Sequence, residues 1–168
     1  QAFYLFYNVN INGNTLTADD WVGAFNGDVC VGSRRWDTSI CQGGVCDVPV
    51  FGDEGVPTTE GYMKTDDLPI FKIYNSSENK YYVAEASGAV IDGATSNACD
   101  DVAPACMEWE DKSFYVIQGL NVISGCIDEI ACNYDENATD DDGSCEFALE
   151  NYDCDGICIE DIDCAGTC

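Results

Sequence analysis

The sequence predicts a mainly β protein in two parts: a β-sandwich over residues 1–120 and an irregular, cysteine-rich tail over residues 121–168. Three observations support this prediction. Short β-prone runs follow one another through the first part, separated by loops rich in Gly, Asp, Asn and Ser. No window shows the apolar period of an α-helix. The tail has few apolar residues and, unlike the first part, no basic residue.

The β-prone runs begin with AFYLFYNVNI at residues 2–11, which has apolar or aromatic side chains on both faces and leads into the hairpin turn signal Asn12-Gly13. DWVGAF (20–25) and DVCVGS (28–33) flank a second such pair, Asn26-Gly27. Further strands are expected at residues 45–51, 60–64, 69–75, 80–86 and 113–120. Strands at this spacing favour a β-sandwich of the jelly-roll or immunoglobulin-like type, and about 120 residues are enough to bury a core.

The charge of the chain is strongly negative and unevenly distributed. The net charge is −26. All 6 basic residues precede Asn121, and the same part of the chain contains 18 acidic residues, whereas the tail contains 14 acidic residues and no basic one. A surface this acidic repels nucleic acid and anionic membranes and attracts cations. We therefore expect no nucleic-acid partner. No membrane insertion is expected either, because no apolar run approaches the length of a membrane span.

The 12 cysteines give a density close to that of a disulfide scaffold. Zinc binding is the alternative use of clustered cysteines, but the chain has no histidine and its cysteines lie among oxygen ligands, which favours disulfides. The cysteines expected to form disulfides are Cys30, Cys41, Cys46, Cys99, Cys106, Cys126, Cys132, Cys145, Cys154, Cys158, Cys164 and Cys168.

Five of these cysteines precede Asn121 and seven follow it, so each part holds an odd number. Either a disulfide joins the two parts, or each part leaves one thiol free. Exposed free thiols are unusual outside the cell, so we favour the bridge. Cys41–Cys46 and Cys99–Cys106 are plausible local pairs, which would leave Cys30 to bridge to the tail. Alternatively, Cys30 is a small buried apolar residue.

The expected disulfides also indicate where the protein works. A reducing cytosol would not preserve them, so we expect a secreted, extracellular protein at the cell surface. Two N-glycosylation sequons, Asn75-Ser76-Ser77 and Asn137-Ala138-Thr139, agree with secretion and make Asn75 and Asn137 candidate glycosylation sites.

The tail contains a loop with the residue pattern of a calcium site. Asn151, Asp153 and Asp155 alternate before a turning Gly156, as oxygen ligands do in calcium-binding loops, and Ile157 would contribute its backbone carbonyl. The remaining candidate ligands are Glu160, Asp161 and Asp163. The loop is not an EF-hand, because Ile162 occupies the place of the bidentate glutamate and no flanking helices are expected.

A second acidic loop lies upstream, where Asp135, Asn137, Thr139 and Asp141 alternate before Asp142-Gly143. Asn137 cannot readily carry a glycan and also ligate a metal through its side chain, so Asp135 and Asp141 are the favoured ligands and the role of Asn137 stays open. The alternative is a solvated, disordered tail. The interleaved cysteines and glycines favour bound calcium, which would neutralise the acids and couple binding to folding.

The segments GCIDEIACNYDENATDDDGSCEF and DCDGICIEDIDCAGTC resemble the Cys/Asp-rich repeats of large secreted surface proteins of aquatic bacteria. Those repeats are in turn similar to thrombospondin type 3 calcium repeats. The resemblance covers about residues 125–168 and implies calcium at Asn151, Asp153 and Asp155 and disulfides throughout. This chain departs from the pattern in having Asn151 in place of the first aspartate and only two loops. DWVGAFNGDVCVG and PIFKIYN resemble the β-sandwich modules of such proteins, which implies architecture rather than activity.

The sequence disfavours catalysis. Without histidine, the usual acid–base and nucleophile–histidine devices are absent. A glycosidase needs paired carboxylates, for which Asp19, Asp20, Glu108 and Glu110 are available, but in so acidic a chain such residues are typically surface charges. We therefore expect a protein that is not an enzyme.

Two non-catalytic functions remain. The first is a repeating subunit of a surface filament or adhesin, whose partners are copies of itself assembled head to tail. The 2–11 strand, with aromatics on both faces, suits insertion into a neighbouring sheet, although an ordinary first strand of its own sandwich is the alternative. Arg34 and Arg35 form the only basic cluster and could meet an acidic neighbour.

The second function is carbohydrate binding. Trp21, Trp36 and Trp109 together with nine tyrosines could build a platform on which extracellular glycans stack. The alternative is that Trp21 and Trp36 pack in the core of the sandwich or at one of its edges. The candidate sugar or partner contacts are thus Trp21, Trp36, Arg34 and Arg35.

Overall fold

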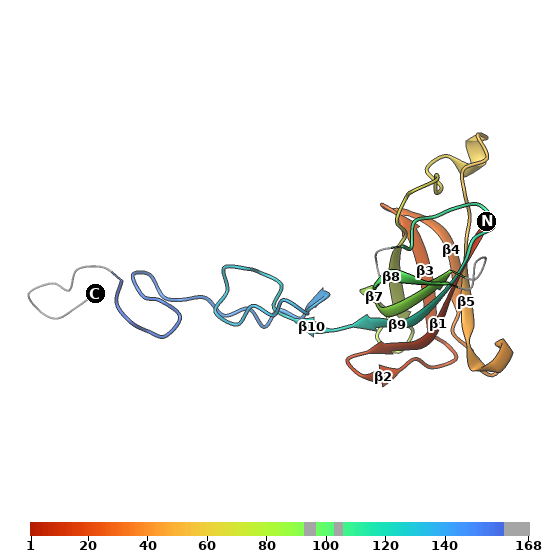
Figure 1. The fold of residues 1–168 in the computed structure, drawn as a ribbon. Helices are drawn as coiled ribbons and strands as arrows, with labels where there is room; N and C mark the ends of the chain where they lie inside the picture. The colour runs from red at the N-terminus through yellow and green to blue at the C-terminus, as the bar shows by residue number, and fades with distance from the viewer. Residues whose placement is uncertain (93–96, 103–105, 160–168) are drawn as a thin grey trace, which may run out of the picture. The chain divides into compact units, whose positions relative to one another are not determined.

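The structure is a computed structural model that describes residues 1–92, 97–102 and 106–159. The chain divides into two compact units, Gln1–Val122 and Ile123–Cys168, here called the β unit and the acidic unit (Figure 1). In the described residues, helical structure is limited to two short 3-10 turns, η1 (Gln42–Gly44) and η2 (Pro57–Thr59). None of the described helices has the length and apolar character needed to cross a membrane. The fold is therefore mainly β, as the sequence predicts.

The β unit is built on a nine-stranded sheet with the order β2-β1-β9-β7-β6-β3-β4, in which β5 also pairs with β1, and β8 with β7. The β1–β9 pair is parallel and the others are antiparallel. The strands are β1 (Ala2–Ile11), β2 (Asn14–Thr15), β3 (Trp21–Asn26), β4 (Val29–Arg35), β5 (Cys46–Val50), β6 (Ile70–Asn75), β7 (Lys80–Asp92), β8 (Asn97–Val102) and β9 (Phe114–Val122).

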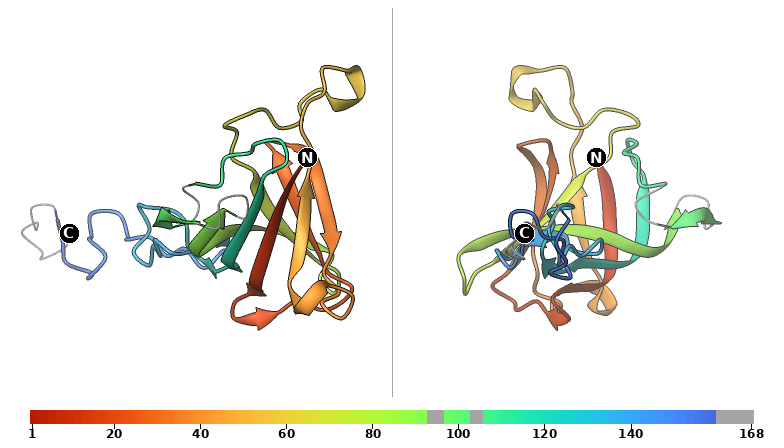
Figure 2. Two further views of the ribbon diagram at one scale, coloured as in Figure 1. Left: turned by 45° about the vertical axis from the view of Figure 1, so that its right-hand side comes forward. Right: turned by 90° about the vertical axis from the view of Figure 1, so that its left-hand side faces the viewer.

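Strand β7 explains why the strands form one sheet. Its first residues, 80–84, pair with β6, whereas residues 85–92 pair with β9, with a β-bulge between Ser87 and Val90. One long strand therefore joins the two groups of strands that a sandwich would keep in separate sheets. The predicted β-sandwich is not confirmed, and the structure instead has a single curled sheet that forms a half-barrel (Figure 2).

The curl brings β4 at one end of the sheet against β5, which is paired to β1. Phe51 N, just after β5, donates a hydrogen bond of 2.9 Å to Val31 O. Gly32 permits this approach, because a Cβ atom at that position would lie 1.7 Å from Pro49 O. Position 32 therefore has no room for any side chain.

The core lies on the inner face of the curl. Tyr4 and Phe6 pack edge-to-face on Phe71, with ring centroids 5.4 and 5.0 Å apart. The buried polar ends are satisfied: Tyr4 Oη donates to Met107 O at 2.9 Å, and Trp109 Nε1 donates to Val50 O at 3.1 Å. Burial is the main reason that the pKa of the Tyr4 hydroxyl is raised far above its ordinary value.

Strand β1 lies inside its own sheet. Residues Phe3–Phe6 pair with β5 on one side and with β9 on the other. The alternative that the sequence left open, an ordinary first strand of its own sheet, is the one found. Both hydrogen-bonding edges over these residues are used within the chain, so the double-sided aromatic pattern reflects burial inside this fold.

Local sequence signals have mixed outcomes. The Asn12-Gly13 turn is confirmed, since both residues have positive φ (50° and 78°), as a tight hairpin turn requires. The strand expected at 60–64 is wrong: residues 60 and 61 lie in a turn, and only an isolated bridge joins Met63 to Gly52. Strand β8 was not expected from the sequence.

The described part of the acidic unit, residues 123–159, has almost no core of its own. It contains one short parallel pair, β10 (Ser124–Gly125) and β11 (Asp140–Asp141). Among its described residues only Cys126 and Ala131 are buried apolar side chains. Two disulfides, Cys126–Cys145 and Cys132–Cys154, cross-link its loops. Crosslinks and turn hydrogen bonds, rather than apolar burial, therefore hold this unit.

Candidate functional sites

The loop around Asp153 is closed on itself. Asp153 Oδ1 accepts hydrogen bonds from Asp155 N at 3.0 Å and from Ile157 N at 2.8 Å, and Asp153 N donates to Ile157 O at 2.9 Å. A further bond from Ile159 N to Asn151 O, 2.9 Å long, closes the outer end. The structure thus gathers the predicted ligands Asn151, Asp153, Asp155 and Ile157 in one small loop. Glu160, Asp161 and Asp163 lie outside the described residues.

The donor set of this loop fits calcium. It offers carboxylate, amide and backbone carbonyl oxygens, and Ile157 O keeps a second lone pair beside the bond from Asp153 N. No three Cys, Asp or Glu side chains converge as a metal cluster among the described residues. Calcium also takes amide, hydroxyl and backbone oxygens, so calcium binding stays a prediction.

In the upstream loop, the structure brings the two favoured ligands to the same glycine. Gly125 pairs with Asp141 across β10 and β11, and a Cβ atom at position 125 would lie 3.6 Å from Asp135 Oδ2. Asp135 Oδ1 accepts from Asn137 N and Nδ2 at 2.9 and 3.2 Å. Thr139 is used differently: its Oγ1 accepts from Ile123 N at 3.1 Å, which makes it an anchor for the backbone.

Sequence reasoning missed Asn133, which positions the acidic loop. Its Nδ2 donates to Ser144 O at 2.6 Å, and its Oδ1 accepts from Glu146 N at 2.8 Å. An asparagine side chain has an NH₂ donor and a carbonyl acceptor, so it can bond a backbone C=O and a backbone N–H at once, as a neighbouring strand does. A clue lay in the sequence, because Asn133 follows Cys132, a residue already expected to be fixed by a disulfide.

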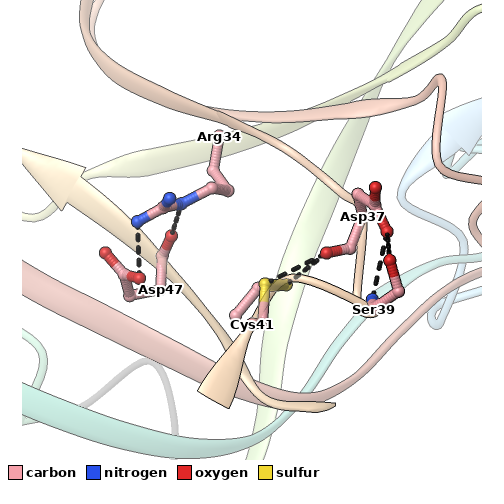
Figure 3. The surroundings of a disulfide bond; sticks show 6 residues. Arg34, Asp37, Ser39, Cys41 and Asp47 are labelled. Atoms are coloured by element: carbon pink, nitrogen blue, oxygen red, sulfur yellow. Dashed lines mark hydrogen bonds and ion pairs between the residues drawn. A yellow bond between two sulfur atoms is a disulfide. The ribbon is translucent and has the colours of Figure 1, made fainter.

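Three disulfides form between described residues: the predicted Cys41–Cys46 pair and the two in the acidic unit. Cys158 is disulfide-bonded as well. Cys41 Sγ lies 3.3 Å from Asp37 O, in the turn that Asp37 and Ser39 build before β5 (Figure 3). The side chain of Cys99 and residues Cys164 and Cys168 lie outside what the structure describes. Cys106 carries no disulfide, so the predicted Cys99–Cys106 pair is not found.

Cys30 corrects the prediction of a bridge to the tail. It carries no disulfide, and it is exposed, so it is not a buried apolar residue either. The reason is its place on β4: its register partner is Phe25, and it lines the outer face of the sheet, where its Sγ lies 3.5 Å from Gly32 O.

Arg34 and Arg35 are both engaged within the chain. Arg34 Nη2 pairs with Asp47 Oδ1 at 2.6 Å, and its Nε donates to Asp47 O at 2.8 Å (Figure 3). Arg35 forms an ion pair with Asp19 and donates from Nε to Ala18 O at 2.7 Å. Both guanidinium groups therefore have an acidic partner within the chain, and a contact with an acidic neighbour stays a prediction.

The candidate sugar-stacking tryptophans have opposite environments. Trp36 is only 5% exposed and belongs to the core, so it is not available to a ligand, and the prediction for it is wrong. Trp21 is 42% exposed. It lies on β3, where Val22 and Ala24 point into the core, and alternation along the strand therefore directs Trp21 to the outer face.

A groove of about 260 Å³ lies on that outer face. It is lined by Trp21, Gly23, Phe25, Cys30, Ser33, Lys72, Tyr74 and Tyr81. Trp21, Tyr74 and Tyr81 are direct register partners across β3, β6 and β7, so their rings form one row, with the two tyrosine centroids 4.9 Å apart. A Cβ atom at Gly23 would come 2.9 Å from the Phe25 ring, so the glycine leaves the floor of the groove open.

Lys72 supplies the charge of this groove. Its register partner is Gly23, and its Nζ lies 4.6 Å from the centroid of the Phe25 ring, a cation–π contact. No acidic residue lines the groove. Within the described part of the chain, Lys72 forms no ion pair.

The turn after β6 is fixed by two of the residues that the sequence singled out. Asp20 Oδ1 accepts from Ser76 N and Oγ at 2.8 and 2.9 Å, and Asp20 Oδ2 accepts from Thr17 N and Oγ1 at 2.7 and 2.9 Å. In the sequon, Asn75 Oδ1 accepts from Ser77 Oγ at 2.8 Å. Asp20 is therefore a structural carboxylate, and glycosylation of Asn75 stays a prediction.

Comparison with protein-family models, curated proteins and solved structures finds no match for this chain.

Proposed function

We propose that the protein is a non-enzymatic, extracellular structural protein of a cell surface, in which calcium and disulfides together stabilise the acidic unit. One observation carries the proposal: the described residues of the acidic unit bury almost no apolar surface, yet its acid-rich loops close around Asp135 and Asp153, and two disulfides cross-link the unit. Fourteen acids without one base repel each other, and bound cations offset this repulsion. Disulfides agree with an oxidising compartment.

Calcium titration calorimetry on the whole chain tests the calcium part of the proposal. Asp155→Asn removes one charged ligand while its backbone bond to Asp153 can persist. Binding should weaken by roughly tenfold or more, because ligand charge sets calcium affinity over orders of magnitude. Glu136→Gln is the matched control, since it removes one acid outside every predicted ligand set. A native chain that binds no calcium would overturn the proposal.

The wider proposal is that copies of the chain assemble into a filament or an adhesive stalk. Its support is the sequence resemblance to repetitive surface proteins. Strand addition would have to use a surface other than residues Phe3–Phe6, since both edges of β1 are paired within the chain there. Negative-stain microscopy with and without a calcium chelator is the test: filaments that fray on chelation support assembly, and single particles at every calcium concentration argue against it.

Carbohydrate binding is the second candidate function, and the outer-face groove favours it. Monomeric proteins rarely leave such a row of large aromatic rings in solvent without using it for binding. A sugar ring has apolar C–H faces that stack on aromatic rings and hydroxyls that need polar partners, and the groove offers both kinds of contact. A glycan array probed with the native chain and with Trp21→Ala tests this candidate, and an array that stays blank would rule it out.

A further inference from the structure

We propose that the outer-face groove binds an acidic saccharide, a sugar polymer that carries carboxylate or sulfate groups. In this assignment Trp21 and Tyr81 stack on the sugar rings, and Lys72 pairs with the negative group. The proposal rests on the carbohydrate-binding candidate and adds the chemical class of the ligand.

The aromatic row gives the site its apolar contact. Trp21 is 42% and Tyr81 is 62% exposed, and Tyr74 lies between them in the register. Cross-strand neighbours on one face are about 5 Å apart, which places three rings side by side over three strands. Rigid strands hold these rings, so little conformational entropy is lost when a ligand stacks on them.

The charge of the groove selects the class of sugar. Lys72 is one of only 6 basic residues in a chain of net charge −26, and it stands in the row next to the aromatic rings. Its ammonium group has the Phe25 ring on one side and no carboxylate as partner among the described residues. An anion bound there would gain an ion pair in a partly desolvated groove, where charge interactions are stronger than in bulk water.

The surrounding shape agrees with a flat, ring-shaped ligand. Gly23 lies between Trp21 and Phe25 on β3, with Ser33 and Lys72 as its partners on either side. The missing side chain at position 23 leaves a step between the rings in which a negative substituent can approach Lys72. The net charge of −26 opposes a second copy and an acidic polymer alike, so the local ion pair with Lys72 has to outweigh this general repulsion.

The test is a titration of the whole chain, followed by tryptophan fluorescence and calorimetry, at one fixed calcium concentration. The probes are polygalacturonate and a sulfated galactan, with uncharged galactan and cellulose oligosaccharides as neutral counterparts. Trp21→Ala and Lys72→Gln should each weaken binding of the acidic polymers by about tenfold or more, as loss of a central contact residue does. Tyr7→Ala, an exposed aromatic residue outside the groove, is the control and should leave affinity unchanged. If Trp21→Ala fails to fold, Tyr81→Ala replaces it.

The outcomes separate the two proposals. Preference for the acidic polymers that is lost in Lys72→Gln supports the inference. Equal binding of neutral and acidic polymers that depends on Trp21 keeps carbohydrate binding but overturns the acidic class. If none of the polymers binds, both carbohydrate binding and the acidic class of ligand are overturned. Both are also overturned if copies of the chain associate with each other and Trp21→Ala abolishes that association.

Discussion

Asp20 shows how a buried carboxylate can organise an acidic protein through hydrogen bonds. It is 4% exposed and accepts four hydrogen bonds from Thr17 and Ser76. Burial by itself raises the pKa of this carboxyl group, but the hydrogen bonds to its charged form outweigh burial and lower the pKa below its ordinary value. The ionised form is therefore the one that the fold uses.

Asp20→Asn should destabilise the β unit at pH 7 by about 1–3 kcal/mol, because the amide NH₂ cannot accept the bonds that one carboxylate oxygen accepted. A lowered folded-state pKa contributes stability above the unfolded value near 4, and this contribution is lost as the pH falls through the folded value. The difference in free energy of unfolding between the native chain and Asp20→Asn should thus become smaller below about pH 4. Urea unfolding followed by tryptophan fluorescence measures it, since all three tryptophans lie in the β unit. Asp19→Asn is the exposed control, and a gap of equal size at pH 3 and pH 7 would contradict this account.

Gly32 carries a second residue-scale prediction. A Cβ atom there would lie 1.7 Å from Pro49 O, which is backbone and cannot swing away. Gly32→Ala should therefore push β4 from β5 and cost about 1–3 kcal/mol, as other overpacked sites do. The melting temperature of the β unit in thermal unfolding measures this loss of stability. Ser33→Ala, the next residue on the same strand, is the control, and an unchanged melting temperature in Gly32→Ala would show that the two strands do not meet in solution.

At the scale of elements, the sequence was informative about strands and turns but not about their partners. Seven of the predicted strands exist, and Asn12-Gly13 makes its turn, because β-prone runs and positive-φ pairs are local properties. The single sheet depends on β7 pairing with two different strands, which no local pattern encodes.

The same limit explains the tryptophans. In DWVGAF both faces of the strand are apolar, so alternation shows that Trp21 and Val22 face opposite ways but not which of them faces the core. The two candidate calcium loops can be identified from the sequence for the opposite reason, because the alternating oxygen-bearing residues and the glycine of each loop lie within one short segment. Asn133 was missed because its partners Ser144 and Glu146 are distant in the sequence.

The disulfides of the two units should differ in importance. Cys132–Cys154 closes a separation of 22 residues in a unit with almost no core, whereas Cys41–Cys46 closes 5 residues in a packed sheet. From loop-closure entropy, Cys132–Cys154 should stabilise the folded state by roughly 3 kcal/mol and Cys41–Cys46 by roughly 2 kcal/mol. The double variant Cys132→Ser/Cys154→Ser should make the acidic unit sensitive to protease, with mass spectrometry locating the cuts. Cys41→Ser/Cys46→Ser is the control and should leave the acidic unit resistant to protease. Equal cleavage of the acidic unit in the two double variants would refute the expected difference in importance.

For the whole molecule, the decisive quantity is the uneven charge. The β unit has a complete apolar core, and the acidic unit has charge, crosslinks and turns. Conditions that change electrostatic repulsion should therefore act mainly on the second unit. Two mechanisms can relieve the repulsion, and they make different predictions: general screening by salt depends on ionic strength alone, whereas ligation by the loops depends on the identity of the cation.

Calcium chelation should lower the protease resistance of the acidic unit and leave the tryptophan-monitored melting of the β unit unchanged. Sodium chloride added to the same ionic strength should restore little of that resistance, because screening leaves the loops without a cation to gather their oxygens. Magnesium should restore less than calcium, since it gives up its waters reluctantly. Asp153→Asn keeps an oxygen that can accept the backbone bonds of its loop but removes one charge, so it should shift the calcium concentration needed for protection upward. If sodium chloride protects as well as calcium does, the acids act as a diffuse charge and the ligand assignment at Asp153 is wrong.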